Sequence, residues 1–198
     1  ENINLESDTL LQKGYNNYWS NTTVVYGPIW TIICSILAKL SLGNVDFGLF
    51  IFKLVNVLIH ILNCYYIYKI SHKKIFVCLY GLNLFILIEA ITNVHNDIFM
   101  ILFILLSFYE LLKRKNILLS ILFLAIATGI KYFAIILLPF VVIYNYRKEK
   151  TSIRILKCIE WGIVYILIVA IPYLFYIKDF SVFAGLWSQQ NKNAKSLC

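Results

Sequence analysis

Charged side chains are scarce in this chain of 198 residues. Asp, Glu, Lys and Arg together make up 14% of the sequence, whereas a soluble domain carries about 25%. Hydrophobic residues account for 61% and aromatic residues for 16%. This composition excludes an ordinary soluble domain. It predicts an all-α protein built as a polytopic bundle of transmembrane helices.

Acidic residues are rarer than basic ones, and no signature of nucleic-acid binding is present. The chain has 10 acidic and 18 basic residues, which gives a net charge of +8. The basic residues fall in short clusters between apolar runs, and no basic stripe is interleaved with aromatic residues. We therefore expect contact with anionic membrane lipids and no nucleic-acid partner.

Paired cysteines are also missing. The chain has five cysteines, none in a CxxC pair, and four of them lie inside apolar runs. Such positions are typical of small packing residues in helices. The sequence contains no internal repeat and no low-complexity linker.

Long apolar runs are what the chain has instead. A helix needs about 20 residues to cross a membrane. The runs predicted to cross once are residues 47–70, 75–90, 98–112 and 159–177. The run 29–42 is too short, and we expect it to form a helix on the membrane surface.

The run 117–144 is too long for one span and has Gly129-Ile130-Lys131 at its middle. A lysine at the centre of a straight membrane helix would lie in lipid, at a cost of about 2.5–3.5 kcal/mol. The sequence therefore predicts a break at residues 129–131. Two short helices would then enter and leave the membrane on the same side, with Lys131 at the turn.

Basic clusters predict the orientation, because Lys and Arg favour cytoplasmic loops. These clusters are residues 69–74, 113–115 and 147–157. All three are cytoplasmic only if the run 117–144 turns back and the runs 75–90 and 98–112 form an up-and-down pair. The polar segment that joins these two runs then lies on the extracytoplasmic face, and so does Lys131.

This orientation divides the chain into three regions. Residues 1–46 form an extracytoplasmic loop and the surface helix, residues 47–177 form the transmembrane helical region, and residues 178–198 form an extracytoplasmic tail. We expect a multi-pass protein of the plasma membrane.

A polar segment interrupts the apolar runs at residues 89–97. Its polar members are Glu89, Asn93, His95, Asn96 and Asp97. Charged groups at membrane depth usually face a water-filled site or a partner. His95 and Asp97 also stand at the start of a predicted helix, where backbone N–H groups favour anions. An ordinary polar loop between two helices is the alternative.

The extracytoplasmic face gathers groups that could perform chemistry. Its carboxylates are Glu6, Asp8, Glu89 and Asp97. A buried carboxylate can act as a general base, and Lys131 could hold a phosphate as a point charge. For Lys131 a snorkelling role at a helix end is the alternative. No cofactor is certain, although His95 and Asp97 could ligate a divalent cation.

Three motifs, taken in order and spacing, carry a resemblance to a known family. They are Tyr26-Gly27-Pro28-Ile29-Trp30, then Glu89 with His95-Asn96-Asp97 and Met100, then Gly129-Ile130-Lys131 with Leu138-Pro139. In this pattern the chain resembles the polyprenyl-phosphate-dependent mannosyltransferases of the GT-C superfamily, in particular the bacterial α-1,6-mannosyltransferase-like group.

The resemblance implies an inverting glycosyltransferase of the cell envelope. Its donor would be a polyprenyl-phosphate-linked sugar, usually mannose, and its acceptor an extracytoplasmic glycan or lipid. The catalytic candidates are Asp97, Asp8 and Glu6. The substrate-binding candidates are His95, Asn96, Lys131, Tyr26 and Glu89.

The family's general base usually lies on the first external loop, just after a first membrane helix that this sequence lacks. Either Glu6 or Asp8 would then serve as the base, or the base lies upstream of Glu1, which is the reading we favour. We therefore expect the chain to be an incomplete enzyme. A membrane transporter and a non-catalytic membrane subunit are the alternatives. A broken hairpin is also found in transporters, but these usually carry inverted repeats and polar groups at the midplane.

Overall fold

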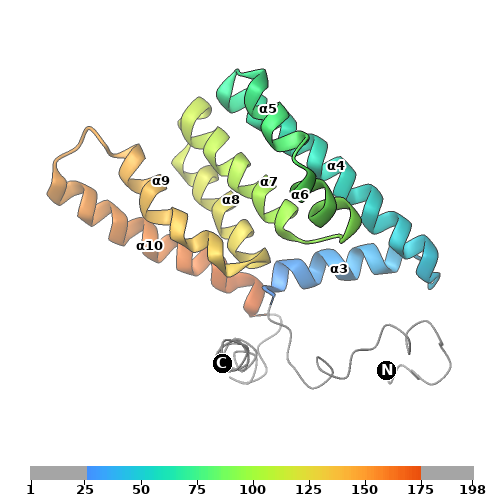
Figure 1. The fold of residues 1–198 in the computed structure, drawn as a ribbon. Coiled ribbons are helices and arrows are strands. Elements are labelled where there is room, and N and C mark those ends of the chain that lie inside the picture. Colours follow the sequence, from blue (N-terminus) through green and yellow to red (C-terminus); the bar gives the residue numbers. More distant parts are fainter. Residues whose placement is uncertain (1–25, 175–198) are drawn as a thin grey trace, which may run out of the picture. The chain divides into compact units, whose positions relative to one another are not determined.

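The computed structural model describes residues 26–174, and every regular element in this range is a helix (Figure 1). Within it, α4 (Val45–Ser71) and α10 (Thr151–Tyr173) are each long and apolar enough to cross a membrane, and a bent helix pair could form a third span. The predicted all-α membrane bundle is confirmed.

Helix α4 has clear sequence signals at both ends. The Asn44 side chain accepts a hydrogen bond from the backbone N–H of Phe47 at 2.9 Å, which satisfies one of the free donors of the first turn. At the other end, His72 adopts a left-handed conformation with φ 55°, and its N–H donates to the Tyr68 carbonyl. The predicted helix at residues 47–70 is confirmed.

The run 75–90, which the sequence predicts to cross the membrane once, is bent. It forms α5 (Lys74–Gly81) and then α6 (Leu84–Leu87), which continues into the π-turn η2 (Ile88–Thr92), with a bend of 52° at the break. The Asn83 side chain accepts from the N–H groups of Phe85 and Ile86 and so begins a new helix. Hydropathy did not predict this bend because it does not mark the capping Asn83 inside the apolar run. A single crossing by the bent pair stays a prediction.

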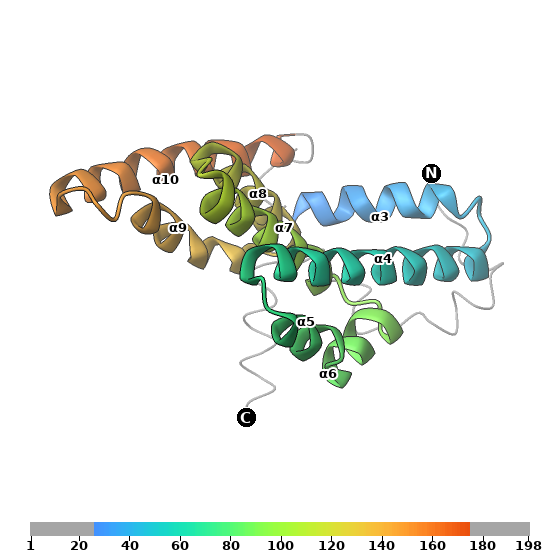
Figure 2. The same ribbon diagram turned by 90° about the horizontal axis from the view of Figure 1, so that it is seen from above.

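Helices α7 (Asp97–Tyr109) and α8 (Ile117–Ile130) form the central hairpin, with the π-turn η3 (Glu110–Arg114) between them. In Figures 1 and 2, α4 packs on the α7 side of this hairpin and α10 on the α8 side. The hydroxyl groups of Ser107 and Ser120 lie 2.9 Å apart and join the two central helices.

The run 117–144 breaks where the sequence predicts. Helix α8 ends at Ile130, and Lys131 has extended backbone angles of φ −145° and ψ 115°. The chain continues as the 3-10 helix η4 (Tyr132–Leu137) and then α9 (Leu138–Asn145), with Pro139 in its first turn.

The run 29–42 also forms a helix, α3 (Pro28–Leu40), with proline at its first position. It packs against α8 and α4. Its position on the membrane surface stays a prediction, as does the division at residues 46 and 177. The predicted tail at residues 178–198 lies outside the described residues.

Two apolar clusters hold the bundle together. The larger joins α8, α9 and α10, and its buried members are Leu111, Ile121, Leu124, Ala125, Ala127, Ala134, Val141, Val142 and Tyr165. The smaller lies directly beneath the polar segment and consists of Ala90, Ile98, Phe99 and Ile130. The candidate site therefore stands on a packed base, not on a free loop.

The three basic clusters lie close together. The Lys113 ammonium donates to the His72 ring nitrogen at 3.0 Å, which joins the first cluster to the second. Lys115 lines one pocket with Arg147 and Lys148, which joins the second to the third. This arrangement is the one that the predicted orientation requires, although the side of the membrane stays a prediction.

Candidate functional site

The polar segment is a folded turn that brings His95 back over Glu89. After η2 the Asn93 N–H donates to the Ile88 carbonyl at 2.9 Å, and Val94 takes a left-handed conformation with φ 55°. The His95 N–H then donates to the Glu89 carbonyl at 3.0 Å. The turn places both side chains at the N-terminal end of α7.

Four ionisable side chains, three from the polar segment and one from the end of α8, form a continuous chain of contacts. His95 Nε2 lies 3.2 Å from a Glu89 carboxylate oxygen, and His95 Nδ1 lies 3.7 Å from an Asp97 carboxylate oxygen. The Lys131 ammonium donates to the other Asp97 oxygen at 2.5 Å. The sequence predicts each of these four residues as a site residue, and the structure brings them together.

These side chains are open to a ligand. The exposed fractions are 49% for His95, 40% for Asp97, 36% for Lys131 and 35% for Glu89. Ion pairs at such exposure contribute about 0–1 kcal/mol to stability. Stability of the fold therefore explains little of this cluster.

A close backbone contact directs Lys131 toward the cluster. The Gly27 N–H donates to the Ile130 carbonyl at 3.3 Å. A Cβ atom added to Gly27 would lie 2.6 Å from the Gly129 carbonyl carbon, and one added to Gly129 would lie 2.6 Å from a methyl carbon of Ile29. Gly27 has no room for a Cβ atom, and Gly129 has room only if Ile29 moves, so the first and third sequence motifs pack closely immediately before Lys131.

Two hollows flank the cluster. The smaller has a volume of about 170 Å³ and is lined by Tyr26, Trp30, Asn93, Val94, His95 and Asn96. Asn96 is 4% exposed, and its side-chain N–H₂ group has no hydrogen-bond partner among the described residues. An unpaired buried donor at a pocket wall can bind a hydroxyl group of a ligand.

The larger hollow is an apolar cleft of about 330 Å³. Its apolar walls are formed by Tyr80, Phe85, Ile86, Ala90, Ile98 and Ile101. Glu89, His95 and Asp97 line the same cleft. The combination suits an amphipathic ligand with an apolar chain and a charged head.

Comparison with known proteins decides the family. The family model described as alpha-(1->6)-mannopyranosyltransferase, N-terminal domain, matches residues 2–147. This chain belongs to that family. It is thus a member of a glycosyltransferase family, and the resemblance carried by the three motifs is confirmed. No curated protein and no solved structure matches the chain.

In this mannosyltransferase-family chain, three polar residues of α4 hold the site's scaffold, and sequence reasoning gave no role to two of them. The Asn56 side chain donates to the Ala90 carbonyl, and His60 Nε2 donates to the Gly81 carbonyl at 3.2 Å. Asn63 donates to the Ile98 carbonyl at 3.1 Å and to the Tyr80 hydroxyl at 2.9 Å. The bonds from Asn56 and His60 satisfy carbonyls of the bent segment, and the bond from Asn63 joins α4 to the first turn of α7. A lone histidine in this apolar run predicts a buried residue of the helix bundle, and His60 is 7% exposed.

The signal for these residues was available in the sequence. Asn56, His60 and Asn63 are spaced i, i+4 and i+7 along an apolar run, so they share one helix face. A polar face inside a membrane helix indicates a neighbour with unpaired backbone groups. Trp30 and Asn93 were also missed as pocket residues. Trp30 packs edge-to-face on Phe99, with ring centroids 5.3 Å apart.

Metal binding has little support within residues 26–174. No group of three His, Cys, Asp or Glu side chains there could hold a metal ion. The two His95 nitrogens face different carboxylates, Glu89 and Asp97, so the three do not converge on one point. Glu6 and Asp8, the other catalytic candidates, lie outside the described residues.

Proposed function

We propose that this chain contributes the donor site of an integral-membrane mannosyltransferase. The enzyme would transfer mannose from a polyprenyl-phosphate donor to a hydroxyl group of a glycan or lipid acceptor at the extracytoplasmic face of the plasma membrane. One observation carries the proposal: the Lys131 ammonium is held by Asp97, a carboxylate that lines the apolar cleft. A phosphate attached to an isoprenoid chain needs a cation for the phosphate and an apolar cleft for the chain.

The reaction breaks the bond between the sugar C1 and the phosphate oxygen. The acceptor oxygen attacks C1 from the opposite face, and its proton passes to a carboxylate base. The phosphate leaves with the bonding electron pair, so the configuration at C1 inverts. Negative charge therefore grows on the phosphate, where Lys131 would stabilise it.

Asp97 acts as a positioning residue in this scheme. Its contact with Lys131 at 2.5 Å holds the ammonium near the cleft. Both of its oxygens already contact protein side chains, one Lys131 and the other His95, so we assign the base to a different group. In this sequence Glu6 and Asp8 are the candidates for that role.

The two hollows would divide the donor between them. The apolar cleft would hold the first isoprene units next to Ile98 and Phe85. The smaller pocket would hold the sugar or the acceptor, with Tyr26 and Asn96 as hydrogen-bonding groups. His95 lines both hollows and would lie near the reacting carbon.

The test is transfer of labelled mannose by membranes that contain the full-length protein. Polyprenyl-phosphate mannose should serve as donor, and nucleotide-linked mannose should not. Lys131→Gln should reduce this transfer. Its control variant is Lys157→Gln, which should not, because Lys157 forms a similar ion pair with Glu160 at 2.6 Å on α10. Equal transfer from both donors would overturn the proposal. No transfer from any lipid-linked sugar would favour a transporter or a non-catalytic subunit.

A further inference from the structure

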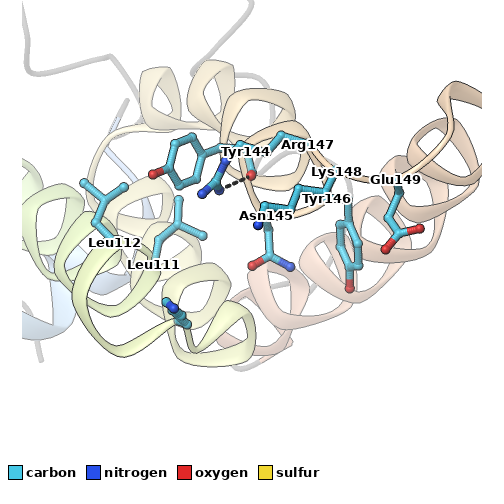
Figure 3. Close-up of a pocket in the computed structure, with 9 residues that line it drawn as sticks. Leu111, Leu112, Tyr144, Asn145, Tyr146, Arg147, Lys148 and Glu149 are labelled. Carbon is cyan, nitrogen blue, oxygen red and sulfur yellow. Dashed lines mark hydrogen bonds between the residues drawn. The ribbon is translucent and has the colours of Figure 1, made fainter.

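A second polar pocket lies among the basic clusters. It occupies about 290 Å³ between the end of the α7–η3 helix and the turn that joins α9 to α10 (Figure 3). Its walls are Leu111, Leu112, Lys115, Tyr144, Asn145, Tyr146, Arg147, Lys148 and Glu149. The proposed transfer reaction uses none of these residues.

The pocket concentrates cations that lack a counter-ion. Within residues 26–174, Lys115, Arg147 and Lys148 form no ion pair, and Glu149 is beyond ion-pair distance of all three. Neighbouring cations behave differently. Arg114 pairs with Glu110 at 3.7 Å, and Lys157 pairs with Glu160 at 2.6 Å. The chain thus supplies carboxylates around the pocket but not to the pocket's own cations.

Arg147 is already fixed for binding. Its guanidinium lies over the Tyr144 ring at 4.2 Å, and Nη1 donates to the Tyr144 carbonyl at 2.9 Å (Figure 3). These two contacts hold the side chain in place and leave its remaining N–H groups for an anion. A preorganised side chain loses less conformational entropy when it binds.

We propose that this pocket binds the phosphate headgroup of an anionic membrane lipid. The planar guanidinium of Arg147 would contact two phosphate oxygens, and Lys115 and Lys148 would add point charges. A lipid fits better than a soluble phosphate because Leu111 and Leu112 form apolar wall beside the cations. Basic pockets between membrane helices are known to bind anionic headgroups.

The experiment measures binding of fluorescent phosphatidylglycerol to the detergent-purified chain. The test variant is Arg147→Gln with Lys148→Gln. The control is Lys73→Gln with Lys74→Gln, which removes the same charge from another basic cluster, outside the pocket. Removal of two cations should weaken binding about tenfold or more, because each contributes about 1 kcal/mol near an anionic lipid. The control should change binding less than about twofold.

A second variant guards against misfolding of the first. Lys115→Asn removes one pocket charge from a different element, and asparagine tolerates the left-handed conformation of Lys115, whose φ is 55°. It should weaken phosphatidylglycerol binding while circular dichroism stays unchanged. Equal losses in the pocket and control variants would overturn the proposal, because binding would then be diffuse. Equal binding of phosphatidylcholine would overturn it too, as would displacement of the lipid by millimolar inorganic phosphate at constant ionic strength.

Discussion

Gly27 and Gly129 lie against each other so closely that neither position can hold a Cβ atom without movement of the backbone or of Ile29. Gly27 precedes the first residue of α3, and Gly129 is the penultimate residue of α8. Lys131 follows two positions later. The contact therefore sets where α8 ends and where the lysine of the candidate site begins.

Substitution of either glycine by alanine should destabilise the protein. In Gly27→Ala the new methyl group overlaps the Gly129 carbonyl, and overpacking of this kind costs about 1–3 kcal/mol. Denaturation in detergent, followed by circular dichroism, measures the effect. Gly162→Ala is the matched control, since nothing lies within 4 Å of a Cβ there and the residue is inside α10. It should be neutral or stabilising by up to about 1 kcal/mol. The same loss in all three variants would contradict the contact.

The side-chain amide of Asn63 should contribute to the stability of the fold. Asn63→Ala removes two hydrogen bonds of a buried amide, one to the Ile98 carbonyl and one to the Tyr80 hydroxyl, which should cost about 1–3 kcal/mol of unfolding free energy. Leu62→Ala is the comparison, because Leu62 is the adjacent residue of α4 and is 43% exposed. The same detergent titration measures both. A smaller effect for Asn63→Ala than for Leu62→Ala would refute the assigned role.

The hydroxyl contact between Thr128 and Tyr165 joins α8 to α10. A double-mutant cycle with Thr128→Val and Tyr165→Phe should give a favourable coupling energy. Interhelical hydrogen bonds in membrane proteins average about 0.6 kcal/mol and reach about 1.7 kcal/mol, and this buried pair should lie in that range. Strictly additive single effects would show that the two hydroxyl groups do not interact.

The two faces of the bundle should be distinguishable by thiol labelling. In a cysteine-free background, Asn93→Cys should react with a membrane-impermeant maleimide applied to intact cells. Lys148→Cys should react only after the membrane is permeabilised, because it belongs to a basic cluster. Both native residues are exposed. The opposite labelling pattern would invert the proposed orientation and place the site inside the cell.

The sequence predicted those parts of the fold that local chemistry determines. The break at Lys131 followed from one charge in an overlong apolar run, and the structure has it. The bend at Asn83 was missed because hydropathy averages over a capping residue. An asparagine inside an apolar run can therefore mark the start of a new helix, just as a charged residue can mark a break.

The candidate site was predictable in its members but not in its connections. Glu89, His95 and Asp97 lie within nine residues of one another, so proximity could be expected. The pairing of Asp97 with Lys131 depends on how α8 ends against α3, which is a tertiary contact between two glycines. Asn56 and Asn63 share a polar helix face that the sequence shows, but the backbone carbonyls that they bind cannot be identified from residue types.

We propose that Lys131, positioned by Asp97, binds the donor's phosphate. The most direct test is a double-mutant cycle in mannose transfer from the polyprenyl-phosphate donor, with Asp97→Asn, Lys131→Gln and the double variant in the full-length protein. Loss of Lys131 should lower kcat by about 100-fold, as for other groups that stabilise developing charge. The double variant should be no worse than Lys131→Gln alone. Near-normal kcat in Lys131→Gln, or fully additive losses in the double variant, would contradict this account.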